Sequence, residues 1–224
     1  MSKYDVNKFK QVTVALNTPF QPDGSVDLKA VRAVVNYFYN KGIRQMYVCG
    51  STGEGFLLDT QERMAVTETV VEEAAGRMNI IVHVGCPDTR HSEELARHAE
   101  KAGADATSAV PCVYYRMGEE SVFQHWTKIT EAADLPFFIY NIPQLTGFNL
   151  SMDLFRRMLE GVDASGAHRR GFSAVVEKPR AFGRSAVCDD YHVSKIAIFR
   201  IKTKKIKQLN FFVLKLRKIV ASSC

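Results

Sequence analysis

The sequence lacks any hydrophobic run long enough to cross a membrane. None of its 224 residues belongs to a stretch of roughly 18 consecutive apolar residues, the minimum for a spanning helix. The N-terminal Met-Ser-Lys-Tyr-Asp is not followed by the apolar core of a secretory signal. Paired cysteines are missing too, because the five cysteines include no CxxC spacing. We therefore expect a soluble, cytoplasmic protein in a reducing compartment.

The motifs of nucleotide and metal sites are also absent. The glycine-rich segment Gly50-Ser-Thr-Gly-Glu-Gly55 lacks the Lys-Ser/Thr ending of a phosphate-binding loop and the GxGxxG spacing of a dinucleotide site. His83 and His91 have no second His or Cys at ligand spacing. His98 and His125 are predicted to be solvated on helices, and Glu54 and Asp88 to be turn or cap residues. We predict neither a metal nor a cofactor.

Charge divides the chain into two unequal parts. Residues 161–224 hold 14 Lys and Arg against 4 Asp and Glu, whereas residues 1–160 hold 16 against 20. The net charge of +6 therefore comes from the C-terminal part. The acidic main part has no sign of a nucleic-acid surface, so we expect no nucleic-acid partner.

A strand–helix rhythm runs through the first part at intervals of about 30 residues, as βαβ units require. Short apolar runs predict buried parallel strands, and helical spacing of apolar residues predicts the helices between them. The expected strands are 12–16, 43–49, 80–84, 106–110 and 136–140; the expected helices are 27–41, 60–76, 91–102, 119–133 and 150–160. This spacing fits an open doubly wound sheet or a (βα)₈ barrel.

Chemistry in such folds lies where strands end. Ser51 and Thr52, set between Gly50 and Gly53, follow the second strand and form a possible cradle for a carboxylate or phosphate. The alternative is a plain glycine turn with a helix cap. Tyr140 ends the fifth strand, either to move a proton or as a half-buried tyrosine anchored by its hydroxyl. Tyr114 and Tyr115 carry the same two interpretations.

Several segments together resemble the pyruvate-dependent class I aldolases, the family that includes N-acetylneuraminate lyase and dihydrodipicolinate synthase. They occur in the family's order over about residues 8–160: Leu16-Asn-Thr-Pro-Phe20, Tyr47-Val-Cys-Gly-Ser-Thr-Gly-Glu54, His83-Val-Gly85, Ala99-Glu-Lys-Ala-Gly-Ala-Asp105, Tyr114-Tyr115 and Tyr140-Asn-Ile-Pro-Gln-Leu-Thr-Gly147. The last segment resembles the lyases. Synthases usually carry an arginine after that proline, where this chain has Gln144-Leu145.

The resemblance implies a (βα)₈ barrel and reversible cleavage of N-acetylneuraminate to pyruvate and N-acetylmannosamine through a Schiff base. It implies that Ser51 and Thr52 hold the pyruvate carboxylate, helped by the backbone of Gly50 and Gly53. It also implies that Tyr140 moves protons. Tyr114 corresponds to a family tyrosine that reaches a neighbouring subunit's site, which implies a homo-oligomer, a tetramer in the family.

The chain departs from this family where the Schiff-base lysine is expected, about 30 residues after Tyr140. No lysine occurs between Lys128 and Lys178, and Lys178, after the run 172–176, is only a weak candidate. We therefore expect an impaired or inactive lyase. Another keto-acid aldolase of the family, or a non-catalytic binder of keto acid or sialic acid, remains the alternative.

Residues 161–224 show no further barrel units. We expect a barrel domain truncated to about five βα units over 1–160, followed by an unrelated basic tail. Apolar residues recur at helical spacing over 195–221, with lysines and arginines between them. The tail is either a frameshifted or mis-joined end, or a selected basic helix; membrane contact by it is not expected.

Overall fold

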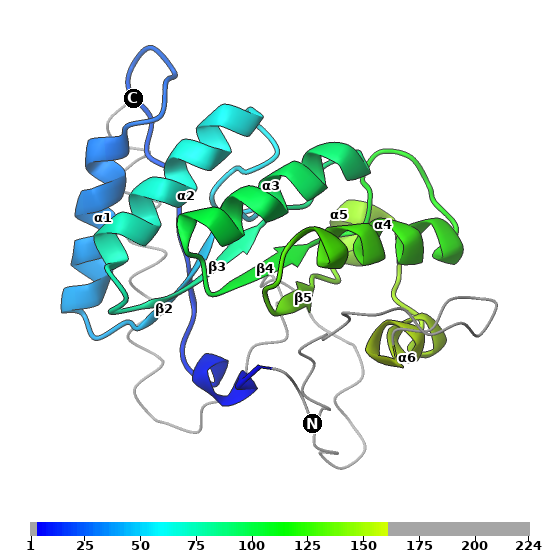
Figure 1. Cartoon of the computed structure of the whole chain (residues 1–224). Coiled ribbons are helices and arrows are strands. Elements are labelled where there is room, and N and C mark those ends of the chain that lie inside the picture. Colours follow the sequence, from blue (N-terminus) through cyan, green and yellow to red (C-terminus); the bar gives the residue numbers. More distant parts are fainter. Residues whose placement is uncertain (1–3, 161–224) are drawn as a thin grey trace.

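Strands and helices alternate along the chain in the computed structural model, which describes residues 4–160. Figure 1 shows the arrangement. The elements are the 3₁₀ helix η1 (Val6–Phe9), β1 (Val14–Ala15), α1 (Leu28–Asn40), β2 (Gln45–Val48), α2 (Thr60–Ala74), β3 (Asn79–His83), α3 (Thr89–Ala102), β4 (Ala106–Ala109), α4 (Glu119–Ala132), β5 (Phe137–Ile139), α5 (Pro143–Thr146) and α6 (Met152–Glu160). The five predicted strand–helix units are all confirmed, and η1 and α5 are additions that the sequence pattern did not predict.

The strand order decides between the two architectures that the spacing left open. The sheet runs β1-β2-β3-β4-β5, and each pair of neighbours is parallel. A doubly wound sheet reverses its strand order and carries helices on both faces. Here α1 to α4 lie in sequence along one face of the sheet (Figure 1), and each packs on the next. This is the arrangement of consecutive βα units in a barrel wall.

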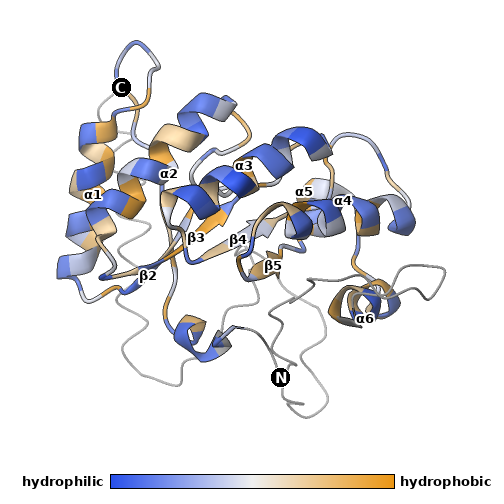
Figure 2. Ribbon diagram, viewed as in Figure 1, coloured by the Kyte–Doolittle hydropathy of each residue, from blue (hydrophilic) through white to orange (hydrophobic). Residues whose placement is uncertain are grey.

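Strands β2 to β5 send alternate side chains toward two different apolar clusters, as the period of two requires. Met46 and Val48 join the large cluster between the sheet and its helices, whereas Tyr47 faces the other side with Ile81 and Tyr140. Figure 2 shows the apolar residues concentrated where strands and helices meet. All four residues of β2 are buried, which explains why apolar residues at Met46, Tyr47 and Val48 follow one another without the alternation of a half-exposed strand.

Within residues 4–160, three α-helices begin at an aspartate whose side chain accepts a backbone N–H of the first turn. Asp27, Asp59 and Asp88 cap α1, α2 and α3 in this way. At α2 the Glu62 side chain also accepts the N–H of Asp59, which completes a capping box. These caps set where α2 and α3 start, and therefore how long the loops that follow β2 and β3 are.

Some predictions fall outside residues 4–160. They are the strand at 172–176, Lys178, the helical pattern over 195–221 and the character of the 161–224 tail. Within the described part of the chain, no helix is long and apolar enough to span a bilayer.

Candidate functional site

The carboxyl ends of the parallel strands meet at one edge of the sheet, and the segment Gly50–Gly53, here called the cradle, lies there directly after β2. It begins with an unusual backbone turn, since Cys49 adopts a left-handed conformation with φ of 57°. The N–H groups of Gly53 and Gly55 then both donate to the Gly50 carbonyl, each at 3.1 Å. A non-glycine residue with positive φ is strained, and such strain is concentrated at functional sites.

The cradle leaves several donors without an internal partner. The backbone N–H groups of Gly50, Ser51 and Thr52 have no acceptor among the described residues, and the Ser51 and Thr52 side chains are exposed. Gly53 differs from the prediction in one respect, because its N–H is already committed to Gly50. Unpaired backbone N–H groups beside exposed hydroxyls are the donors that an anion-binding turn uses.

Contacts on both sides hold the cradle in place. The Thr18 hydroxyl donates to the Gly53 carbonyl at 2.7 Å, which ties the cradle to the segment after β1. At its other end Gly50 lies so close to the Tyr47 ring that an added Cβ would be 2.4 Å from it. The cradle is therefore a fixed part of the strand edge rather than a free loop.

Tyr140, directly after β5, is joined to this edge through aromatic contacts. Its side chain is buried, and its ring meets the Tyr47 ring at 5.8 Å and 82° and the His83 ring at 6.1 Å and 90°. No residue in the described part of the chain hydrogen-bonds to the Tyr140 hydroxyl. The interpretation of Tyr140 as a tyrosine anchored by its hydroxyl therefore finds no partner within residues 4–160. Its ring is fixed while its polar end stays available.

Tyr47 and Ser108 form a buried polar chain beside Tyr140 that sequence reasoning missed. The Tyr47 hydroxyl donates to the Ser108 hydroxyl at 3.0 Å, and Ser108 donates to the Phe138 carbonyl at 2.8 Å. Burial raises the pKa of the Tyr47 phenol far above its usual value, so Tyr47 stays a neutral donor. The strand register brings these groups together, because it pairs Ser108 with His83 and with Phe138 on the neighbouring strands. A sequence pattern could have identified them only if this register had been known.

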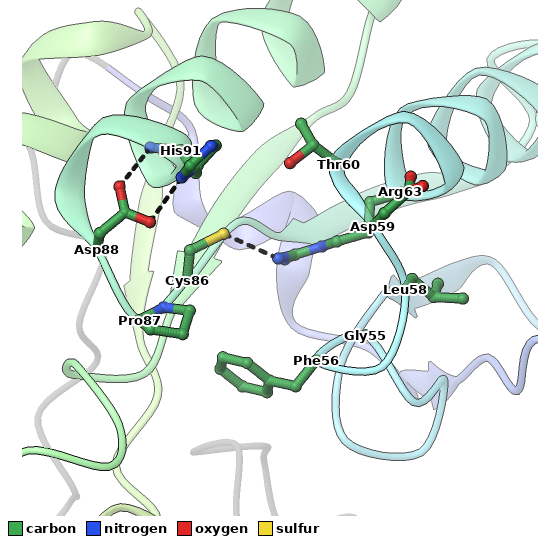
Figure 3. A pocket seen from close by; sticks show the side chains of 10 residues that line it. All are labelled: Gly55, Phe56, Leu58, Asp59, Thr60, Arg63, Cys86, Pro87, Asp88 and His91. Atoms are coloured by element: carbon green, nitrogen blue, oxygen red, sulfur yellow. Dashed lines mark hydrogen bonds and ion pairs between the residues drawn. The ribbon is translucent and has the colours of Figure 1, made fainter.

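A buried arginine fixes the end of β3 from the outer side. Arg63 of α2 is only 3% exposed and forms no ion pair within the described residues. It donates to the carbonyls of His83 at 2.6 Å and Gly85 at 3.0 Å, and to the Cys86 Sγ at 3.1 Å. Figure 3 shows the Arg63 guanidinium directed at Cys86, with the Asp88–His91 pair on the far side of a hollow. The hollow, of about 230 Å³, is lined by residues of the loops after β2 and β3 and the starts of α2 and α3.

Tyr114 is placed differently from Tyr140. It follows β4, is 89% exposed, and has a positive φ of 78°. Its ring packs edge-on against Tyr115 at 5.0 Å, and Tyr115 is also exposed. The described residues therefore do not bring Tyr114 to the buried Tyr140 cluster.

The predictions for the weaker candidates have mixed outcomes. Asp88 is a helix cap, as predicted, and Glu54 lies in the turn after the cradle. His98 is half-buried and contacts Glu68 at 2.8 Å. The prediction that His125 is solvated is wrong: it is 2% exposed on the face of α4 that packs on α3, where its Nδ1 lies 2.9 Å from the Thr89 hydroxyl. Packing between helices therefore decided its environment.

No lysine in the described part of the chain lies on the inner face. All six lysines in residues 4–160 are exposed: Lys8, Lys10, Lys29, Lys41, Lys101 and Lys128. Lys8, for example, pairs with Asp105 at 2.8 Å. An amine that attacks a carbonyl beside Tyr140 is thus not supplied by residues 4–160.

Comparisons with known proteins agree with this geometry. The sequence pattern of the dihydrodipicolinate synthetase family matches residues 8–167. N-acetylneuraminate lyase of Mediterraneibacter gnavus is 37% identical over 163 residues, which cover 72% of this chain and 52% of the lyase. The 4-hydroxy-tetrahydrodipicolinate synthase of Chlorobaculum parvum is 36% identical over 177 residues, covering 76% of this chain and 60% of the synthase.

Among solved structures, the wild-type sialic acid aldolase of Ruminococcus gnavus is similar, with a TM-score of 0.66 and 39% identity. That match covers 67% of this chain and 50% of the aldolase. The chain thus spans about half the length of the relatives it matches, and its five strands correspond to part of a TIM barrel.

Proposed function

Because the chain belongs to the dihydrodipicolinate synthetase family, we propose that the cradle and Tyr140 form the α-keto-acid site of an aldolase of the N-acetylneuraminate lyase type. Ser51 and Thr52 hold the carboxylate of pyruvate or sialic acid through their hydroxyls and N–H groups, while Gly50 and Gly53 shape the turn. Tyr140 moves the proton when the bond between the pyruvate and N-acetylmannosamine parts breaks or forms.

One observation carries this proposal: the cradle and Tyr140 belong to one set of contacts. Gly50 touches the Tyr47 ring, and the Tyr47 ring packs on Tyr140. A carboxylate on exposed N–H donors and a phenol on a buried ring are thus held together at a single strand edge. Two relatives named N-acetylneuraminate lyase are 37% and 42% identical to this chain, which supports sialic acid as the substrate class.

The chemical step needs an amine that the described residues do not supply. We propose that the chain binds its keto acid without forming the Schiff base at the expected place, and that cleavage is impaired or absent. Lys178, outside the described residues, is the remaining candidate. The absence of a lysine from the inner face within residues 4–160 also favours the second candidate function, a non-catalytic binder of keto acids or sialic acid.

Substrate preference and assembly are further parts of the proposal. A synthase-type dicarboxylate site is the alternative, and it is less well supported because exposed Leu145 and Gln144 occupy the segment where synthases usually carry an arginine. We propose a homo-oligomer in which Tyr114 reaches a neighbouring subunit's site. The exposed, strained Tyr114 beside exposed Tyr115 supports this assembly, because large exposed aromatics mark interaction surfaces.

Trapping with borohydride tests the covalent step. The whole chain is incubated with pyruvate and borohydride, which reduces an iminium to a stable amine, and its intact mass is measured. We expect an unchanged mass, while an intact N-acetylneuraminate lyase under the same conditions gains one reduced pyruvate. A mass gain by this chain would overturn the proposed loss of the Schiff base, and peptide mapping would then show whether Lys178 carries it.

Binding tests the cradle independently of catalysis. The variant with Ser51→Ala and Thr52→Val loses two hydroxyl donors to a carboxylate. We expect its Kd for pyruvate, measured by calorimetry, to rise at least about tenfold, because one charge-assisted hydrogen bond contributes about 1.5–3 kcal/mol. Ser121→Ala, on the exposed surface of α4, is the matched control. Equal affinity in all three proteins, or no binding of pyruvate or sialic acid by the parent chain, would refute the keto-acid site.

A further inference from the structure

We propose that His83 is the positioning residue that holds the Tyr140 ring in its working orientation. This inference rests on the proposed role of Tyr140. It adds His83, a residue to which the proposed function gives no role. His83 ends β3, between the cradle and Tyr140, and is 1% exposed. It does not need to touch the substrate; it acts through the ring of Tyr140.

The imidazole is surrounded by aromatic rings from three segments. Tyr140 meets it edge-on at 6.1 Å and 90°, Phe56 lies at 5.6 Å and 64°, and Tyr47 lies at 6.2 Å with a tilt of 46°. The Tyr47 ring also packs against the Tyr140 ring, at an interplanar angle of 82°. Two nearly perpendicular neighbours leave its ring little freedom to tilt, since aromatic pairs favour such edge-to-face geometry.

Polar contacts fix the imidazole itself. Its Nε2 accepts the Val110 N–H at 3.3 Å, and its Nδ1 lies 3.5 Å from the Arg63 guanidinium. Gly85 packs so closely that an added Cβ would be 3.0 Å from Nε2. Side chains that are locked by such outer contacts hold a site to the tolerance that catalysis requires.

The imidazole is neutral at ordinary pH. Burial, followed by the nearby Arg63 charge, lowers the pKa of His83 to about 3, against a hydrogen bond to the Cys49 backbone that raises it. A neutral ring keeps Nε2 as an acceptor for the Val110 N–H, so the orientation of the imidazole is fixed at neutral pH.

The direct test uses the whole chain with ¹³C-labelled tyrosine rings and no ligand. The Tyr140 signal is assigned by its loss in Tyr140→Phe. We expect His83→Asn to shift or broaden this signal and to leave that of Tyr37, on α1, unchanged. We expect His83→Phe, which keeps a ring against Tyr140, to restore it. If His83→Asn does not fold, His83→Gln takes its place. An unaltered Tyr140 signal in a folded variant would overturn the inference.

Pyruvate affinity gives the second readout. His83→Asn should raise the Kd about three- to tenfold, the effect of losing one aromatic pair, and by less than twofold in a Tyr140→Phe background. The same fold loss in both backgrounds would mean that His83 does not act through Tyr140. A parent chain that binds no pyruvate would refute the keto-acid proposal alone, because the ligand-free tyrosine spectrum still decides the role of His83.

Discussion

Replacing Gly55 by alanine is expected to destabilise the chain by about 3 kcal/mol or more, at or beyond the upper end of what an overpacked methyl group costs. A Cβ at this position would lie 1.9 Å from the Cys49 carbonyl oxygen and 2.7 Å from its carbon. Both are backbone atoms, so no side chain can rotate away. Either the Cys49 turn or the hydrogen bond from Gly55 N–H to the Gly50 carbonyl has to give way.

Urea denaturation at neutral pH measures this loss. Gly118→Ala is the matched control, because an added Cβ there meets no atom within 4 Å and the backbone φ is −71°. Its cost should stay within about 1 kcal/mol, the typical value of alanine at a helix N-cap. Since domains are stable by only about 5–15 kcal/mol, Gly55→Ala should also weaken pyruvate binding. Equal stability of the two variants would show that the Cys49 turn relaxes freely.

The close approach at Gly55 marks a limit of what the sequence predicts. The glycine-rich segment and its hydroxyls indicate an anion site, and position it after the second strand. The requirement for glycine at position 55, however, depends on the left-handed turn at Cys49, a cysteine that no local rule places at positive φ. The sequence pattern therefore identifies the turn, but only the folded backbone shows which of its glycines cannot be replaced by another residue.

Local signals predict the elements themselves well. Apolar runs bounded by turn residues predict all five strands to within two residues at each end, and Asp27, Asp59 and Asp88 cap helices because their carboxylates face first-turn N–H groups. Strand order is less accessible, because spacing is shared by barrels and open sheets. Family motifs, rather than periodicity, indicate the barrel.

Tertiary contacts explain most of the features that the sequence pattern does not predict. Tyr47, His83 and Ser108 lie on one inner face because of the register between three strands, which no single segment reveals. His125 is polar and helical, which suggests solvent, yet it is covered where α4 meets α3. In both cases the environment of the side chain is decided by residues distant in the sequence.

Acidification from pH 7 to pH 5 is expected to lower the free energy of unfolding by about 4 kcal/mol. Burial lowers the pKa of His125 to about 4, and burial with the Arg63 charge lowers that of His83 to about 3. In the unfolded chain both titrate near 6.5. Above that value both states are neutral. Below it the two histidines bind protons in the unfolded chain and stay neutral in the folded chain. Each histidine therefore lowers the free energy of unfolding by up to about 1.4 kcal/mol per pH unit.

The sign and the window distinguish these histidines from the carboxylates. Asp23 and Asp88 have a lowered carboxyl pKa because of hydrogen bonds to Ser25 and His91, so their contribution disappears only below the usual carboxyl range. Urea denaturation between pH 7 and 5 therefore reports mainly the buried imidazoles. His125→Gln removes one of them and should halve the pH-dependent loss. A loss that is unchanged in this variant would show that His125 is protonated inside the fold, at a buried Nε2 that has no hydrogen-bond partner among residues 4–160. Stability that rises on acidification would contradict the prediction for both histidines.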